Sequence, residues 1–80
     1  MLIYEITISD EVTFSFGQHD ADKWVVRIFD HQVARSVTDL RYPNLLQIAH
    51  LYGLDNHQLQ KAQSGARGRS YEITQYALTG

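Results

Sequence analysis

Apolar and polar residues alternate strictly in the first part of the chain. In residues 2–8 every second side chain is apolar and points to the same face of an extended strand. Residues 12–16 repeat this pattern after a short polar break. Two such runs predict an antiparallel hairpin with one buried face. We expect a loop at residues 17–22 and then a third strand at residues 24–29, a segment dense in β-branched and aromatic residues.

The pattern allows two structures for residues 31–38. As a strand, the segment would alternate Val33, Arg35 and Val37 on one face and pair with the third strand. As a helix, it would be capped by Asp30 and would gather Val33, Ala34, Val37 and Leu40 on one side. Valine and threonine content favours the strand, and the helix stays open as the alternative.

Pro43 begins the helical part of the chain, because its fixed φ suits the first turn of a helix. An apolar stripe at i, i+3, i+4 and i+7 follows, formed by Leu45, Ile48, Ala49 and Tyr52. Gly53 is placed to end this helix in a left-handed cap. Asp55 can cap a second helix over residues 56–63, with Gln58 three residues later as in a capping box.

A basic turn at residues 64–69 and a strand at residues 70–78 complete the pattern. The predicted fold class is α+β, in the order βββ(β or α)ααβ, with an antiparallel sheet of about three to five strands and two or three short helices. The 80 residues are enough for one domain and too few for two. We therefore expect a single small domain over residues 1–80.

Charge is distributed unevenly along the chain. Residues 1–40 hold seven acidic and three basic residues, a net charge of −4, and residues 41–80 hold four basic and two acidic residues, a net charge of +2. The whole chain has a net charge of −2, which by itself disfavours a nucleic-acid binder. The polarity is compatible with a basic binding face backed by an acidic sheet.

The composition gives no sign of a membrane or secreted protein. No apolar stretch approaches the roughly 18 residues that a membrane span needs, and the N-terminus lacks the basic and apolar regions of a signal peptide. The chain has no cysteine, so neither disulfides nor thiolate metal sites are available. We expect a cytoplasmic protein with no membrane association.

Residues 45–64 resemble the helix-turn-helix of Cro-type phage repressors. A small residue, Ala49, stands where the second helix would cross the first, and Gly53 allows the turn a positive φ. Leu54 can fill the gap between the helices, and Leu59 returns an apolar side chain to their shared core. The chain departs from those repressors because strands precede the helix pair, so a plain helical hairpin packed on a sheet is the alternative.

The resemblance implies a small DNA-binding regulator of transcription that works as a homodimer, with its helix pair at residues 44–63 and its recognition helix near residues 56–63. Asparagine and glutamine amides can bind the adenine edge in the major groove, and basic side chains can bind phosphates. The implied nucleic-acid-binding residues are Asn56, His57, Gln58, Gln60, Lys61, Gln63, Arg67 and Arg69.

A second, weaker resemblance covers residues 24–46. The strand at Trp24–Phe29, the run Ala34–Val37 and the stretch Leu40–Leu46 look like a small bacterial domain family of unknown function, which implies an α+β sheet domain and no activity. The alternative function is then a protein-binding module, such as a phage- or plasmid-type inhibitor, antitoxin or adaptor, that acts through its sheet face. A helix at residues 31–41 would favour DNA, and a strand would favour a protein partner or the family of unknown function.

Catalytic and metal-binding patterns are incomplete. The four histidines lack the i, i+4 spacing that places two ligands on one helix face, and no further residues complete a metal site. Serine, histidine and aspartate occur without the local signature of a nucleophile. We therefore expect a non-catalytic protein with no metal and no cofactor.

Overall fold

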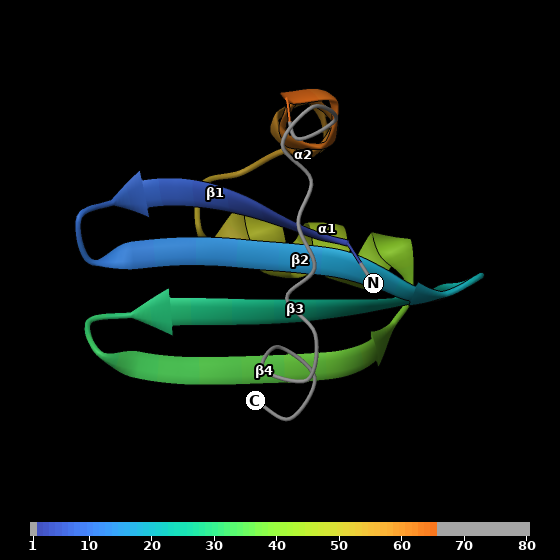
Figure 1. Ribbon diagram of the computed structural model, residues 1–80, viewed down its shortest axis with the longest axis horizontal. Helices are drawn as coiled ribbons and strands as arrows, with labels where there is room; N and C mark the ends of the chain where they lie inside the picture. The colour runs from blue at the N-terminus through green and yellow to red at the C-terminus, as the bar shows by residue number, and fades with distance from the viewer. Residues whose placement is uncertain (1, 66–80) are drawn as a thin grey trace.

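The computed structural model describes residues 2–65, which form a four-stranded sheet and two helices (Figure 1). The strands are β1 (Ile3–Ser9), β2 (Val12–Asp20), β3 (Lys23–Asp30) and β4 (Val33–Leu40), and the helices are α1 (Tyr42–Leu51) and α2 (Asn56–Gly65). All neighbouring strands are antiparallel, in the order β1-β2-β3-β4. The predicted α+β class is confirmed, and the strand predicted at residues 70–78 lies outside the described residues.

The segment that the sequence left open between strand and helix is the strand β4. A two-residue turn at His31 and Gln32, with φ of 49° and 71°, brings Asp30 opposite Val33. Both central residues have positive φ, which is the geometry of a type I′ turn. Because β4 pairs along β3 with only one irregularity, the third helix of the alternative interpretation does not form.

β2 is longer than the sequence pattern predicted, because it continues through Gly17 to Asp20 where we expected a loop. Gly17 pairs with Ile3 on β1 and with Val25 on β3. A Cβ atom at Gly17 would lie 2.7 Å from Cδ1 of Ile3 and 2.5 Å from the backbone oxygen of Leu2. The missing side chain therefore leaves room for β1, which explains a glycine in a strand interior.

The hydrophobic core lies between one face of the sheet and the two helices. Figure 1 shows α1 behind the sheet and α2 lying beside β1. The core cluster consists of Phe14, Phe16, Val26, Ile28, Leu45, Ala49, Leu54 and Leu59. Both helices are short, and neither helix in the described part of the chain is long and apolar enough to cross a membrane.

Aromatic rings form a row across this layer. Tyr4, Phe16 and Trp24 lie on β1, β2 and β3, with ring centroids 5.4 Å and 6.2 Å apart along the row. Trp24 then contacts Tyr42 at the start of α1, at 5.2 Å. The rings supply the bulk that a thin sheet-and-helix domain needs, and they fix the start of α1 against β3.

Candidate binding surfaces

The turn between α1 and α2 has the geometry that the sequence predicted. Gly53 has a φ of 80°, and its amide donates to the carbonyl oxygen of His50 at 3.0 Å. The amide of Leu54 donates to the carbonyl oxygen of Ala49 at 2.9 Å. This pair of bonds is the Schellman motif that ends many helices. Ala49, Leu54 and Leu59 are all buried, so the apolar contacts expected of a helix-turn-helix are present.

The first turn of α2 is closed by a reciprocal pair of hydrogen bonds. The amide of Gln58 donates to Oδ1 of Asp55 at 2.9 Å, and the amide of Asp55 donates to Oε1 of Gln58 at 2.9 Å. This is the predicted capping box. The capping box occupies the side-chain oxygen Oε1 of Gln58, one of the groups that a base-reading residue would use.

Asn56 is also engaged within the domain. The hydroxyl of Tyr42 donates to its Oδ1 at 2.6 Å and so joins the first residues of α1 and α2. A bidentate contact to adenine needs both the oxygen and the amide nitrogen of an asparagine. Asn56 would have to give up the bond to Tyr42 before it could make that contact.

The remaining predicted nucleic-acid-binding residues differ in their exposure and in whether the structure describes them. His57, Gln60 and Lys61 are exposed on α2, on the side away from buried Leu59. Gln63 is half-buried and lines a pocket against the sheet. Arg67 and Arg69 lie outside the described residues. Among the described residues, the exposed polar face of α2 therefore carries Lys61 as its one formal positive charge.

The edge of the sheet at β4 is a second candidate surface, which the sequence pattern did not locate. Every residue from Val33 to Asp39 is exposed, and in the described part of the chain no element lies beyond β4 (Figure 1). Val33 and Val37 keep 51% and 40% of their surface exposed. Phe29 on neighbouring β3 is 46% exposed. A period-2 pattern marks such residues as apolar but cannot tell a central strand from an edge strand.

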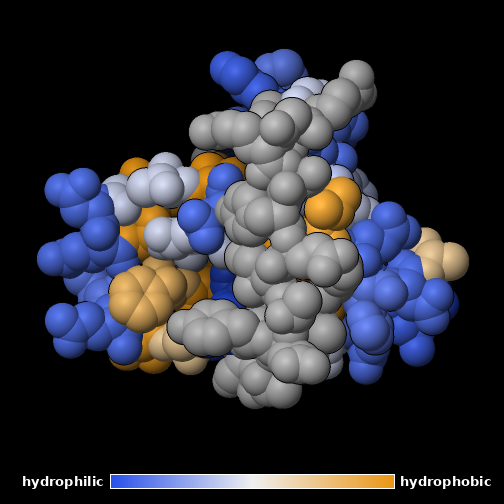
Figure 2. Space-filling model, in the orientation of Figure 1, coloured by the Kyte–Doolittle hydropathy of each residue, from blue (hydrophilic) through white to orange (hydrophobic). Residues whose placement is uncertain are grey.

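Charged residues lie at both ends of the strands, and Glu5, Arg27 and Arg35 lie within them. Figure 2 shows hydrophilic side chains at both ends on the face opposite α1. At one end, Nε2 of His31 lies 2.8 Å from Oε2 of Glu11, and its Nδ1 contacts Asp30. The side chains of His31 and Glu11 are largely solvent-exposed and that of Asp30 is partly exposed, so these contacts add little stability. No group of three or more histidine and carboxylate side chains in residues 2–65 is arranged to hold a metal ion.

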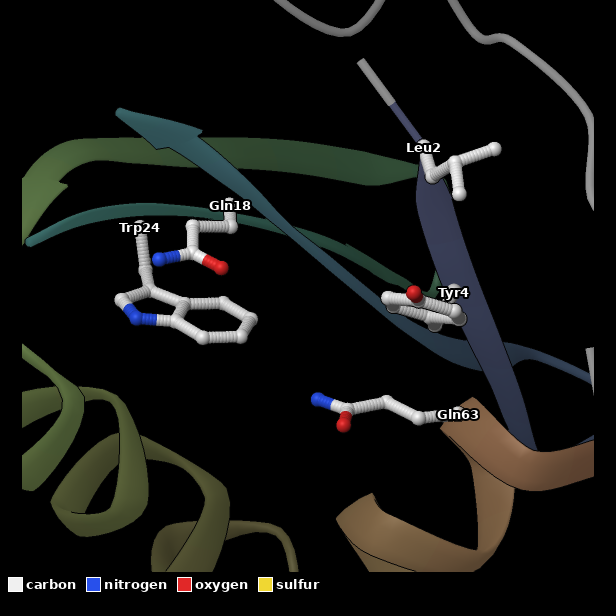
Figure 3. Close-up of a pocket in the computed structure, with 5 residues that line it drawn as sticks. All are labelled: Leu2, Tyr4, Gln18, Trp24 and Gln63. Carbon is white, nitrogen blue, oxygen red and sulfur yellow. The ribbon is translucent and has the colours of Figure 1, made fainter. Parts of the chain in front are cut away.

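A pocket of about 270 Å³ opens between α2 and the first residues of the sheet (Figure 3). It is lined by Leu2, Tyr4, Gln18, Trp24 and Gln63. In Figure 3 the side chain of Gln63 extends from α2 into the space between the rings of Tyr4 and Trp24. The lining has aromatic faces and carboxamides and no formal charge. No sequence motif marked this pocket.

No protein-family model, curated protein or solved structure matches the chain, so the binding surfaces must be interpreted from their own geometry.

Proposed function

We propose that this protein is a non-catalytic protein-binding module and that the edge of β4 accepts an extended segment of its partner. The observation that carries the proposal is the exposure of every residue from Val33 to Asp39 at an open sheet edge. An unpaired edge presents backbone donors and acceptors that another strand can satisfy. An inhibitor, antitoxin or adaptor acts by binding its partner, so an open sheet edge of this kind would be sufficient for its function.

The hairpin geometry indicates which backbone groups are available. Asp30 and Val33 flank a two-residue turn and therefore form a hydrogen-bonded pair. By alternation, Arg35 and Val37 also direct their backbone groups toward β3, whereas Ala34 and Ser36 direct theirs away from the sheet. A bound strand would bond to those outward groups, and its side chains would meet the exposed valines of β4.

Binding through the helix pair is the second candidate function, and the buried Ala49, Leu54 and Leu59 around Gly53 support it. In that case the protein would be a DNA-binding transcription regulator that reads bases with α2. Two findings weigh against it: β4 is a strand where repressors of this type have a helix, and Asn56 and Gln58 are held by hydrogen bonds within the domain. Protein binding is therefore the preferred proposal.

Site-specific crosslinking tests the β4 proposal, because the native chain has no cysteine. Ala34→Cys and Lys61→Cys variants, each carrying a benzophenone label, would be irradiated in an extract of the source cells. We expect a covalent polypeptide adduct from the label on β4 and none from the label on α2. The mass of the adduct then gives the identity of the partner.

Ser36→Pro is the matched control. It removes an outward backbone donor without touching the β3–β4 hydrogen bonds, and proline is tolerated on edge strands. We expect it to abolish the adduct while the unfolding midpoint stays close to that of the parent. Adduct formation that survives Ser36→Pro, or that occurs equally from α2, would contradict strand addition at β4.

Salt-dependent binding to random duplex DNA tests the second candidate. A helix-turn-helix contact should weaken steeply as salt rises, and Lys61→Ala should lower the slope of log affinity against log salt by about 1. Gln47→Ala on α1 is a neutral control. Absence of binding at low salt would exclude the helix pair as a duplex-binding unit.

A further inference from the structure

We propose that the pocket between α2 and the sheet binds a single unpaired adenine base, which stacks on the indole of Trp24 and is read by the carboxamide of Gln63. The pocket lies on the face of the sheet that the helices cover, since Trp24 contacts Tyr42 of α1 and Gln63 belongs to α2. The site is separate from the β4 edge, so each surface can function without the other.

The volume of the pocket suits one bicyclic ring system. An apolar cavity of about 150 Å³ accepts benzene, a ring of six carbon atoms, so a purine base of ten non-hydrogen atoms needs about 250 Å³ by the same ratio. The pocket has about 270 Å³ and opens to the surface between α2 and the sheet. A base can therefore enter it while the attached sugar stays outside.

Aromatic rings give the pocket a rigid wall. Tyr4 and Trp24 are half-buried and lie on either side of Phe16, with ring centroids 5.4 Å and 6.2 Å from that of Phe16. Phe16 is fully buried, and Tyr42 packs against Trp24 from α1 at 5.2 Å. Because these rings are already held in place, a base that stacks on the indole loses little free energy to side-chain ordering. Stacking on aromatic side chains is a main source of affinity for unpaired bases.

Gln18 is fixed at the rim of the pocket. Its Nε2 donates to the carbonyl oxygen of Ala21 at 2.7 Å, and Figure 3 shows its side-chain oxygen turned toward the space between Trp24 and Tyr4. The described lining carries no formal charge, so it offers no partner to a phosphate. The neutral base is therefore the part of a nucleotide that the pocket can hold, because a buried charge needs a partner.

Gln63 is placed to read the edge of the base. Its half-buried side chain extends between the rings of Tyr4 and Trp24 (Figure 3), and within residues 2–65 its carboxamide has no hydrogen-bond partner. The carboxamides of Asn56 and Gln58, by contrast, are engaged within the domain. Adenine presents the N6 donor beside the N7 acceptor, and a free carboxamide can bind both. In a duplex the faces of the base are stacked, so only an unpaired base can enter.

Titration with adenosine, followed by NMR, tests the site. Trp24 is the one tryptophan of the chain, so its indole N–H resonance is assigned without ambiguity, and the side-chain amide of Gln63 is a second probe. We expect both resonances to shift with a dissociation constant of about 1 mM, since one stacked ring and one bidentate contact each contribute modestly. Cytidine and glucose, which lack the purine edge, should bind at least about tenfold more weakly.

7-Deazaadenosine tests the role assigned to Gln63. This nucleoside has a carbon atom in place of N7, so it loses one of the two hydrogen bonds to the carboxamide and keeps the stacking. We expect it to bind the parent about tenfold more weakly than adenosine does. Gln63→Ala should remove that difference. Gln60→Ala is the matched control, because it removes the same kind of side chain from the exposed face of α2, and it should keep the full difference.

Single-stranded oligodeoxyadenylate distinguishes a base within a strand from a free nucleoside. Binding at least about tenfold tighter than that of adenosine, and weaker at high salt, would identify a nucleic-acid strand as the source of the base. Equal affinities would identify the free nucleoside, and either result supports the site. The same strand paired with its complement should leave the Trp24 resonance in place, and an equal shift with the duplex would contradict the requirement for an unpaired base.

Three results would overturn the adenine site. They are an indole resonance that stays in place at ten times the expected dissociation constant, cytidine binding as tight as that of adenosine, and a 7-deazaadenosine effect that survives Gln63→Ala. Urea unfolding, followed by the fluorescence of Trp24, verifies that each variant is folded. Crosslinking from β4 is unaffected by any of these results, so the pocket and the β4 edge can fail separately.

Discussion

The hydroxyl of Tyr42 donates a hydrogen bond of 2.6 Å to Oδ1 of Asn56, fourteen residues along the chain. Tyr42 lies at the start of α1, and its ring also packs against that of Trp24 in a tilted arrangement, so one side chain connects both helices with the sheet. The same bond occupies the residue that begins the proposed recognition helix. The contact therefore stabilises the helix pair, and it engages the Asn56 oxygen that a contact to a base would need.

Removing this hydroxyl should destabilise the domain modestly. Tyr42→Phe keeps the ring contact with Trp24 and removes the donor, so we expect a loss of about 0.5–1 kcal/mol in the free energy of unfolding. Asn56→Ala should cost about the same, and the double variant little more than either single change. Urea unfolding measures all three. Additive losses would show that the two side chains act independently.

Stability should also fall at alkaline pH through the same residue. Burial raises the pKa of Tyr42 above its ordinary value of 10.0, because desolvation disfavours the phenolate. The folded state therefore holds the phenolic proton where the unfolded chain releases it, and stability decreases as pH rises above about 10. Tyr42→Phe should flatten that decrease. Unfolding midpoints between about pH 8 and pH 11 would show the difference, and equal slopes in both proteins would contradict it.

Glycine at position 17 should be intolerant of a side chain. Gly17→Ala would place Cβ against the backbone oxygen of Leu2, which cannot move without shifting β1. We expect a loss of about 1–3 kcal/mol from overpacking. Gly53→Ala provides the contrast: nothing lies within 4 Å of its Cβ position, but its φ of 80° adds about 1–2 kcal/mol of backbone strain. Gly53→Asn should recover part of that loss, whereas Gly17→Asn should recover none.

The sequence predicted elements that depend on local chemistry and left open those that depend on pairing. The Gly53 cap and the box between Asp55 and Gln58 follow from short-range geometry, and the structure confirms both. The continuation of β2 through Gly17 could not be read in this way, because the reason for that glycine is the approach of Ile3 from another strand. Tertiary contact, and not propensity, decided that segment.

The candidate site was less predictable than the fold. The residues from Asn56 to Gln63 have the polar character of a recognition helix, but nothing local indicates that Tyr42 lies close enough to bond with Asn56. Similarly, Val33 and Val37 read as ordinary strand residues until the strand order places β4 at an edge. Surface function of this kind depends on which neighbour is absent, and sequence patterns carry little information about that.

The β3–β4 turn explains why the segment after Phe29 was ambiguous in the sequence. A type I′ turn favours Asn-Gly at its two central positions, yet here His31 and Gln32 adopt positive φ. The amide of His31 donates to the carbonyl oxygen of Glu11 at 3.0 Å, and its ring contacts Glu11 and Asp30. Contacts to the neighbouring turn thus offset the strain, so the hairpin forms without its usual sequence signal.

Replacing the two residues should therefore stabilise the protein. His31→Asn with Gln32→Gly relieves backbone strain of about 1 kcal/mol at each position and gives up only the surface contacts of the His31 ring with Glu11 and Asp30, which contribute less than about 1 kcal/mol. We expect a net gain of about 1 kcal/mol and a Tm higher by about 4–8 °C, measured by thermal unfolding. The single variant Gln32→Gly keeps the His31 contacts and should gain about 1 kcal/mol by itself. A lower Tm in that single variant would mean that the turn is not strained, because Gln32 makes no ion pair that the substitution removes.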